Sequence, residues 1–332
     1  MRQPSVLMTC ISPLKAIENR AMEPITFKPL YMERVWGGRE LERVYGRELP
    51  EAHTPYGESW EIVDRAGEQS VVDEGELAGT TLHELWTMRR DEIFGCGMPE
   101  STRFPILIKV LDARDDLSIQ VHPPVDLADS LGGEPKTEMW YIAAADPGAK
   151  LYVGLKKGVG RADFEQAIAN GTVEQCVHAL TPSAGQSIFI PSGRLHAIGA
   201  GFLIHEIQQN SDTTYRVFDW NRCGLDGKPR ELHVEKSLAS IDFNDFEPGM
   251  DVPCDNNLAS CQWFRTDRIH LDADEDLKIA DHKFRLISVV DGCLTSESGR
   301  RFGVGRFLLL PCGCGPLRAA GNSTVLVVSL PC

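Results

Sequence analysis

Long hydrophobic runs are missing from this sequence, because no apolar stretch approaches the roughly 18 residues that a membrane-spanning helix needs. Cysteine is also sparse: the chain has 10 in 332 residues, and no two of them form a Cys-x-x-Cys pair. This spacing argues against a disulfide scaffold, a zinc knuckle and a thiol redox motif. We therefore expect reduced thiols, a cytoplasmic location and no membrane partner.

Positive charge is in short supply as well. The chain has 34 Lys and Arg against 48 Asp and Glu, which gives a formal net charge of −14. Nucleic-acid and anionic-membrane binding need clustered cations, so we predict no nucleic-acid partner. The hydrophobic fraction of 42% and the charged fraction of 25% are those of an ordinary globular protein.

The first segment, residues 1–22, lacks the features of a secretory signal. A short apolar patch, Val6 to Ile11, follows a single Arg2, and no convincing cleavage site comes after it. We interpret this segment as a disordered tail or as an over-extended start.

Short apolar segments separated by turn residues dominate the rest of the chain. We expect strands at residues 105–111, 117–122, 139–143, 186–190, 202–208, 215–220, 284–290, 306–310 and 325–330. Short helices are expected at 82–94, 164–170, 173–180 and 233–239. Many short strands without βαβ units indicate a mainly β protein built from barrels or sandwiches.

A weak internal repeat suggests two related halves. Phe189-Ile-Pro-Ser-Gly193 is similar to Leu309-Leu-Pro-Cys-Gly313, and only the first copy is followed by a histidine. We predict a metal-binding catalytic domain with N-terminal strands at 23–240, and a degenerate β domain without a metal site at 241–332.

Three segments carry candidate metal ligands. In the expected strand 117–122, Gln120 and His122 share one face, because side chains two residues apart point the same way. Glu138 leads into an apolar strand, where an unpaired carboxylate would be costly to bury. His196 follows a tight Pro-x-Gly-x-x-His turn that aims it back toward that face. Two nitrogens and two oxygens suit zinc, although two histidines and a carboxylate also fit non-haem iron.

These segments resemble the two motifs of the cupins, with Gln120 in place of the usual leading histidine. The fuller sequence is similar to the type I mannose-6-phosphate isomerases in their short form, through the matching segments Val35-Trp-Gly-Gly38, Gly57-Glu-Ser-Trp-Glu61, Gln120-Val-His-Pro123, Lys136-Thr-Glu138, Pro191-Ser-Gly-Arg-Leu-His196, Glu206-Ile-Gln-Gln-Asn-Ser-Asp212 and Thr214-Tyr-Arg216.

The resemblance implies two cupin-like β-barrel (jelly-roll) domains and one Zn²⁺ per chain, bound by Gln120, His122, Glu138 and His196. It also implies an active-site arginine at Arg216 and a lysine at Lys136. Longer members of the family have a histidine where this chain has Pro135, so no role of that histidine is carried over.

The implied reaction interconverts mannose 6-phosphate and fructose 6-phosphate through a cis-enediol. Three residues are candidates for the base: Glu206, Asp212 and Lys136. Each has an alternative interpretation: Glu206 as a carboxylate that orients a ligand histidine, Asp212 as a turn residue, and Lys136 as a phosphate or hydroxyl contact. A desolvated Lys136 beside zinc would have a depressed pKa.

Arg216 lies among apolar residues, so we expect it to stabilise the enediolate or to bind phosphate. The basic residues Arg222, Lys228 and Arg230 are interpreted as a solvated loop, with phosphate guidance as the alternative. His205 faces away from Glu206 on the same strand and is expected to be a core histidine. The expected partner is a sugar phosphate, and the chain is expected to be a monomer or homodimer.

Two other functions fit parts of the pattern. An iron-dependent cupin dioxygenase would use the same histidines and carboxylate, but Gln120 and the cations at Lys136 and Arg216 weigh against it. A non-catalytic sugar-phosphate-binding cupin would keep the pocket without turnover, and the full polar set at the site argues against that.

Overall fold

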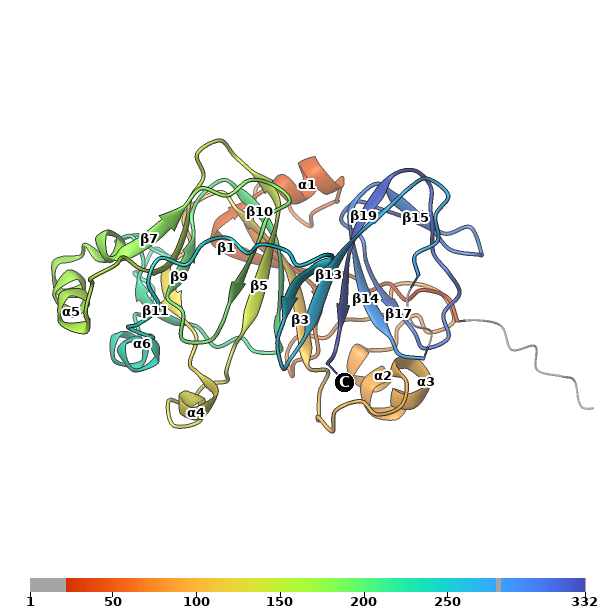
Figure 1. Cartoon of the computed structure of the whole chain (residues 1–332), viewed down its shortest axis with the longest axis horizontal. Coiled ribbons are helices and arrows are strands. Elements are labelled where there is room, and N and C mark those ends of the chain that lie inside the picture. The colour runs from red at the N-terminus through yellow and green to blue at the C-terminus, as the bar shows by residue number, and fades with distance from the viewer. Residues whose placement is uncertain (1–21, 279–281, 332) are drawn as a thin grey trace, which may run out of the picture.

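A computed structural model describes residues 22–278 and 282–331 of the chain, so the predicted tail at 1–22 lies outside the described residues except for Met22. Four antiparallel sheets form two sandwiches that lie side by side in Figure 1. The prediction of a mainly β protein with a few short helices is confirmed. The division into units 23–240 and 241–332 stays a prediction.

The first sandwich contains a six-stranded and a five-stranded sheet. The six-stranded sheet has the order β1 (Leu30–Gly38), β2 (Tyr56–Ile62), β3 (Ile106–Ala113), β10 (Phe202–Gln209), β5 (Glu138–Ala145), β8 (Ser187–Ile190). The five-stranded sheet has the order β11 (Tyr215–Phe218), β4 (Ile119–Val121), β9 (His196–Ile198), β6 (Leu151–Leu155), β7 (Val177–Leu180).

The second sandwich follows the same plan with fewer strands. Its larger sheet has the order β12 (Asn257–Ser260), β13 (Arg265–Leu271), β19 (Ser323–Ser329), β14 (Arg285–Asp291), β17 (Phe307–Leu310). The smaller one has the order β16 (Arg301–Gly303), β15 (Cys293–Thr295), β18 (Arg318–Ala319).

Helices occupy the connections between the strands. They are α1 (Glu40–Tyr45), α2 (Leu82–Met88), α3 (Arg90–Phe94), α4 (Val125–Ala128), α5 (Arg161–Asn170), α6 (Val234–Ser240) and a 3₁₀ turn, η1 (Val173–Cys176). The helix expected at 82–94 is two helices that meet at Arg89. Thr81 caps the first with a capping box to Glu84, as its sequence suggests.

The prediction of a helix over residues 173–180 is wrong for its second half. Only residues 173–176 are helical, as η1, and Val177–Leu180 form strand β7. This strand pairs with β6 through Leu151↔Leu180 and Tyr152↔Ala179. Tertiary pairing therefore overrides the local helical pattern.

Strict alternation decides which side chains face the site. On β10, Ile204 belongs to the core between the two sheets of the first sandwich, so Glu206 two residues on shares that inner face. His205 and Ile207 point to the other face, where the second sandwich and helices α2 and α3 pack against the sheet. The six-stranded sheet is thus covered on both faces.

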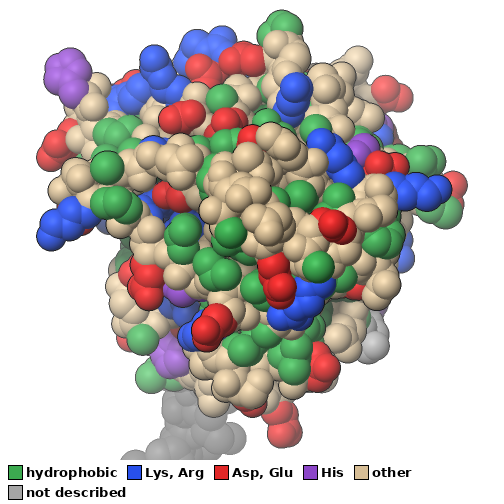
Figure 2. Space-filling model, turned by 90° about the vertical axis from the view of Figure 1, so that its left-hand side faces the viewer, with side chains coloured by type: hydrophobic (Ala, Val, Ile, Leu, Met, Phe, Trp, Pro, Cys, Tyr) green, Lys and Arg blue, Asp and Glu red, His purple; other side chains and the backbone are tan. Residues whose placement is uncertain are grey.

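The acidic excess of the chain is not gathered into one patch on the face shown in Figure 2. There, acidic and basic side chains are interspersed with hydrophobic ones. Among the described residues, no helix has the length and apolar character needed to cross a membrane.

Candidate metal centre and active site

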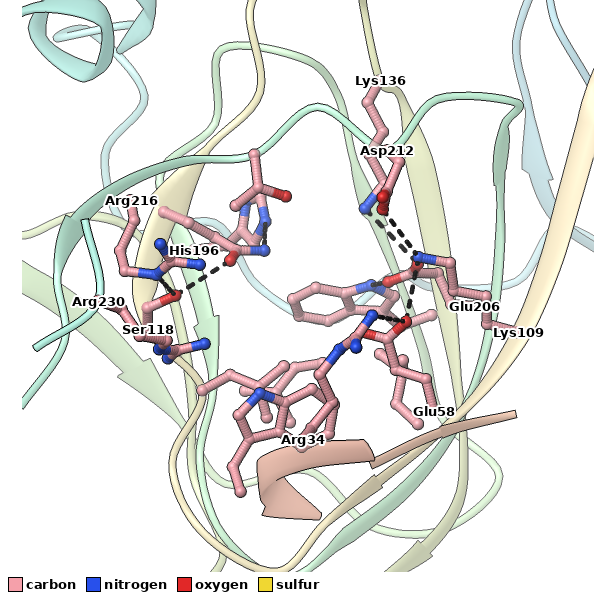
Figure 3. Close-up of a pocket in the computed structure, with 17 residues that line it drawn as sticks. Arg34, Glu58, Lys109, Ser118, Lys136, His196, Glu206, Asp212, Arg216 and Arg230 are labelled. Carbon is pink, nitrogen blue, oxygen red and sulfur yellow. Dashed lines mark hydrogen bonds and ion pairs between the residues drawn. The ribbon is translucent and has the colours of Figure 1, made fainter. Parts of the chain in front are cut away.

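A pocket of about 430 Å³ opens between the two sheets of the first sandwich (Figure 3). Both sheets contribute polar residues to its wall. From the six-stranded sheet come Lys109 on β3, Glu206 on β10 and Lys136, which lies two residues before β5. From the five-stranded sheet come Gln120 on β4, His196 on β9 and Arg216 on β11. The pocket is therefore a place where buried polar groups of both sheets face one another.

Three of the predicted metal ligands meet at one point beside this pocket. Candidate ligand atoms of His122, Glu138 and His196 all lie within 4.8 Å of one another, and all three residues are buried. The Nε2 atom of His122 is 3.5 Å from Oε2 of Glu138, and Nε2 of His196 is 3.7 Å from Oε1. The structure thus brings together residues that are up to 74 positions apart in the sequence (196 − 122 = 74).

Both imidazole rings are held with Nε2 directed toward that carboxylate. Nδ1 of His122 lies 2.8 Å from the carbonyl oxygen of Thr213, and Nδ1 of His196 lies 2.9 Å from that of Arg194. When Nδ1 donates its proton to a carbonyl, the Nε2 lone pair is left free to bind a metal. The rings are therefore set in the tautomer that a metal ligand requires.

The tight turn before His196 is built as expected. Gly193 has a φ of +92°, a conformation that side chains rarely adopt, and its amide donates to the carbonyl of His122 at 2.9 Å. This bond ties the turn to the strand that carries the first histidine. His196 then pairs with Gln120 across β9 and β4.

Gln120 is the fourth predicted ligand and lies at the edge of the cluster. Its Nε2 is 3.3 Å from Nε2 of His196, and its Oε1 accepts from Ser118 Oγ at 3.3 Å. A half-turn of the amide about its Cγ–Cδ bond would exchange the two atoms and direct Oε1 toward the histidine nitrogen. The position is therefore close enough for an oxygen ligand.

Glu138 carries the strongest sign that a cation belongs here. Its side chain is fully buried, and neither carboxylate oxygen accepts a well-aligned hydrogen bond from the described residues. The Lys136 ammonium lies 2.6 Å from Oε2 as an ion pair. Burial alone would raise the pKa of Glu138, but Lys136 and His122 hold that pKa well below its usual range. A buried carboxylate that stays ionised beside the Nε2 atoms of two imidazole rings fits a divalent cation.

The surroundings of Lys136 act on the pKa of its ammonium group in two opposite directions. Burial would lower the pKa of its ammonium, but the carboxylates of Glu138 and Glu206 raise that pKa above the ordinary value. Its Nζ lies 2.6 Å from Glu138 and 3.5 Å from Glu206. Lys136 is therefore a positive charge held by two carboxylates, and a depressed pKa of this lysine beside zinc stays a prediction.

Glu206 has the opposite electrostatic balance. Burial and the nearby Glu138 raise the pKa of its carboxyl group to about 7, although Lys136 and Lys109 act against the rise. Oε2 accepts a hydrogen bond from Trp140 Nε1 at 3.2 Å. Backbone carbonyls, not Glu206, contact the Nδ1 atoms of the two histidines.

Asp212 lies near the same cluster but is more open to solvent. Its side chain is 51% exposed, and its Oδ1 is 3.8 Å from Lys109 Nζ. It shares this lysine with Glu206, whose Oε1 is 3.9 Å away. The structure therefore places two of the candidate bases, Glu206 and Asp212, beside Lys109, and the third, Lys136, beside Glu206.

Lys109 is a site residue that the sequence reasoning missed. It is 4% exposed, lies 3.5 Å from Glu58, and stacks on the Trp60 ring at 4.6 Å. Arg34 also contacts Glu58, at 3.0 Å, and lines the pocket. The signal was present, because Lys109 is the only charged residue in the apolar run Ile106–Leu111, and the cost of burial that singled out Glu138 applies equally to it.

Arg216 lies at the other end of the pocket, as Figure 3 shows. Its Nε donates to Ser118 Oγ at 3.2 Å and its Nη1 to the carbonyl of Glu231 at 2.9 Å. Arg216 pairs with Gln120 across β11 and β4 and lines the pocket. Its position agrees with the expectation of an arginine near the active site.

Comparison with known proteins identifies the family and the fold of the chain. Residues 25–149 match the family model described as phosphomannose isomerase type I, catalytic domain. The chain is 36% identical to the mannose-6-phosphate isomerase ManA of Bacillus subtilis (strain 168) over 93% of this chain and 99% of that protein. It is 40% identical to the mannose-6-phosphate isomerase of Streptococcus mutans over 65% of this chain and 67% of that protein.

Comparison with solved structures also finds proteins described as mannose phosphate isomerases. The crystal structure of the mannose 6-phosphate isomerase from Bacillus subtilis matches with a TM-score of 0.83 and 30% identity, covering 93% of this chain and 100% of that one. A putative mannosephosphate isomerase from Archaeoglobus fulgidus shares the fold, with a TM-score of 0.77, 19% identity and coverage of 96% and 100%. By sequence over nearly its whole length, and by fold, this chain belongs to the type I mannose-6-phosphate isomerase family of enzymes.

Proposed function

We propose that the protein interconverts mannose 6-phosphate and fructose 6-phosphate, with one Zn²⁺ held by Gln120, His122, Glu138 and His196. The observation that carries the proposal is the convergence of His122, Glu138 and His196 on one buried point, with Nδ1 of each ring bonded to a backbone carbonyl and each Nε2 turned toward the carboxylate. A bound zinc ion would supply Lewis acidity to the sugar oxygens without changing its redox state.

The donor set supports a metal of this kind. Zinc accepts imidazole nitrogens and carboxylate oxygens. The set here has two imidazole nitrogens, one carboxylate and one amide oxygen, and no cysteine takes part. The same three core ligands also fit iron. The family to which the chain belongs contains isomerases, which favours zinc and a sugar phosphate over oxygen chemistry.

Glu206 is the residue best suited to move the proton. An aldose becomes a ketose in two proton transfers at carbon and two at oxygen. A base takes the C2 proton of the open-chain sugar while O1 gains a proton, which gives a cis-enediol; O2 then loses its proton and the base returns a proton to C1. A carboxyl group whose pKa lies at about 7 can both accept and release a proton at neutral pH. Asp212 is half exposed, and Lys136 is held protonated by its ion pairs, so both are weaker candidates for the base.

The cations around Glu206 fit the remaining needs of the reaction. Lys136 and Lys109 are both buried and can donate to the sugar oxygens, where negative charge develops in the transition state. Arg216 presents a guanidinium from the opposite sheet. The proposed roles are electrostatic stabilisation for Lys136 and substrate binding for Arg216.

A coupled assay tests the proposal. Purified protein is supplied with mannose 6-phosphate, and fructose 6-phosphate is measured, with glucose 6-phosphate and unphosphorylated mannose as comparison substrates. We expect fructose 6-phosphate to form from mannose 6-phosphate far faster than any product forms from the others. Absence of turnover in the metal-loaded protein would contradict the proposal.

We further propose a cytoplasmic enzyme that acts as a monomer or homodimer. Cys96, Cys176, Cys223, Cys254, Cys261, Cys293 and Cys314 are free thiols, which suits a reducing compartment.

A further inference from the structure

Three arginines gather at the end of the pocket that lies away from the lysines. Arg216 and Arg230 line the pocket, and Arg222 lies behind Arg230 on the same loop between β11 and α6. One buried carboxylate, that of Asp219, accepts hydrogen bonds from Arg222 and Arg230, and Asp219 is 5% exposed. The other acids beside the group, Asp115 and Glu231, have side chains that are 65% and 84% exposed. Positive charge is therefore in excess at this end.

Asp219 orients two of these guanidinium groups. Arg230 donates to both of its oxygens, from Nε at 2.7 Å and from Nη2 at 2.5 Å. Arg222 donates to Oδ1 from Nη2 at 3.1 Å, and its Nη1 lies 3.5 Å from Asp115. The paired edge of Arg230 is thus fixed against Asp219, and Figure 3 shows the guanidinium beside the open space of the pocket.

The loop that carries Arg230 is attached to the sandwich at its start. Trp220 adopts a φ of +54° and donates from Nε1 to the carbonyl of Leu117 at 2.7 Å. The Arg230 side chain is only 22% exposed. For Arg230, these observations replace the interpretation of Arg222, Lys228 and Arg230 as a solvated loop.

Two donor groups at this end have no protein acceptor. Among the described residues, no hydrogen bond is made by Nη2 of Arg216 or by Nη1 of Arg230. Burial, and after it the positive charge of Arg230, lower the pKa of Arg216. An anion between the two guanidinium groups would relieve both conditions.

The spacing to the metal centre suits a phosphorylated sugar. Arg216, Gln120 and His196 are paired in a row across β11, β4 and β9. Adjacent strands are about 4.8 Å apart, so the backbones of Arg216 and His196 are about 10 Å apart. Arg216 lies against this row, because its Nε donates to Ser118 Oγ, which in turn donates to Gln120 Oε1. The carbonyl end of an open-chain hexose can therefore lie at the metal while its phosphate lies at the arginines.

We propose that Arg230, positioned by Asp219, is a second phosphate-binding residue beside Arg216 and selects for sugars with a terminal phosphate. The inference rests on the proposed isomerase function. Guanidinium groups bind phosphate oxygens with two donors at once, which gives direction as well as charge. Arg222 is turned to Asp219 and Asp115 and does not line the pocket.

The test compares Arg230→Gln with Lys228→Gln in the metal-loaded enzyme. Lys228 is an exposed residue of the same loop that does not line the pocket, so its substitution removes the same charge at a place without a binding role. The measured quantities are the inhibition constant of inorganic phosphate and the KM and kcat for mannose 6-phosphate. Arg230→Lys and Asp219→Asn are measured alongside, and circular dichroism checks that each variant is folded.

We expect Arg230→Gln to raise the inhibition constant of phosphate and the KM by about tenfold or more, because one charge-assisted contact is lost, with kcat changed less than about threefold. Arg230→Lys should recover part of the affinity, and Asp219→Asn should raise KM while the charge of Arg230 remains. Lys228→Gln should change neither constant by more than about twofold.

Equal effects of Arg230→Gln and Lys228→Gln would overturn the proposal, and so would a loss of kcat at unchanged phosphate affinity. Both results differ from failure of the proposed function, in which the unaltered enzyme itself would not convert mannose 6-phosphate.

Discussion

Nε2 of His122 lies 3.5 Å from Oε2 of Glu138, and both side chains are buried. Nδ1 of His122 is occupied by the Thr213 carbonyl, so the ring directs a lone pair toward an ionised carboxylate. Two electron-rich groups are stable at this distance in a dry interior only with positive charge between or beside them. His196 makes the same approach from the other side, which gives the arrangement its resemblance to a metal centre.

Replacement of His122 by Gln should greatly weaken metal binding, because an amide oxygen is a poorer zinc ligand than an imidazole nitrogen. Loss of an outer-shell partner already costs about 10–100-fold in metal affinity, and loss of a direct ligand should cost at least as much. Metal content measured by mass spectrometry after gel filtration should fall from one ion per chain to a trace. His205→Gln is the matched control, because His205 is equally buried but bonds Tyr45 and Ser288 away from the pocket. Full metal content in His122→Gln would remove this residue from the ligand set.

Arg216→Ala should fold and keep its metal while most activity is lost. Its guanidinium bonds only Ser118 and a backbone carbonyl among the described residues, so the fold depends little on it. Loss of a charge-assisted contact with the substrate phosphate should cost about tenfold or more in kcat/KM. Steady-state kinetics and metal analysis of the same sample check both statements, and turnover equal to that of the unaltered enzyme would disprove the assignment.

Lys109→Met should move the acidic limb of the pH–rate profile to higher pH. Glu206 must be ionised to act as a base, and burial raises its pKa to about 7, so activity should fall as the pH drops below that value. Lys109 favours the ionised form of Glu206, and without it the pKa of Glu206 rises further. The profile of kcat/KM for both proteins measures the shift. An unchanged limb would indicate that a group other than Glu206 is the base.

His205 should make the folded state sensitive to acid. Burial lowers the pKa of its imidazole from 6.5 to about 3, so the folded protein does not bind a proton that the unfolded chain takes up below pH 6.5. Stability from this group is therefore complete above pH 6.5 and is lost as the pH falls toward 3, by up to about 1.4 kcal/mol per pH unit.

Urea unfolding at pH 7.5 and 5.0 measures this dependence. His205→Gln should be less stable than the unaltered protein at pH 7.5, and the difference should shrink at pH 5.0. A difference that stays constant between the two pH values would show that His205 does not titrate in this way.

The candidate ligand positions could be found in the sequence because each one carries a local signal of burial, alternation or turn geometry. Gln120 and His122 are two residues apart on a strand, and Glu138 leads into an apolar one. The tight turn before His196 added the last ligand. Lys109 carries the same burial signal as Glu138, because it is a charged residue in an apolar strand, but it was missed. The sequence does not show that Glu58 and Glu206, on the two neighbouring strands, pair with it.

The parts of the fold and site that could not be predicted depend on pairing between residues far apart in the sequence. The segment 173–180 has a helical pattern over its whole length, and the partner that turns its second half into a strand is β6, more than 20 residues earlier. The contact between Arg230 and Asp219 also depends on how a loop folds back, so the basic cluster had no visible partner in the sequence. Alternation and burial are local signals, but pairing is not.

The most direct test of the account is turnover of mannose 6-phosphate as a function of metal content. The protein is stripped with a chelator, dialysed, and titrated with Zn²⁺ while fructose 6-phosphate formation is followed. We predict that the stripped protein is folded and inactive, and that activity returns in proportion to bound zinc up to one ion per chain. Full turnover by protein shown to hold no metal would contradict the account.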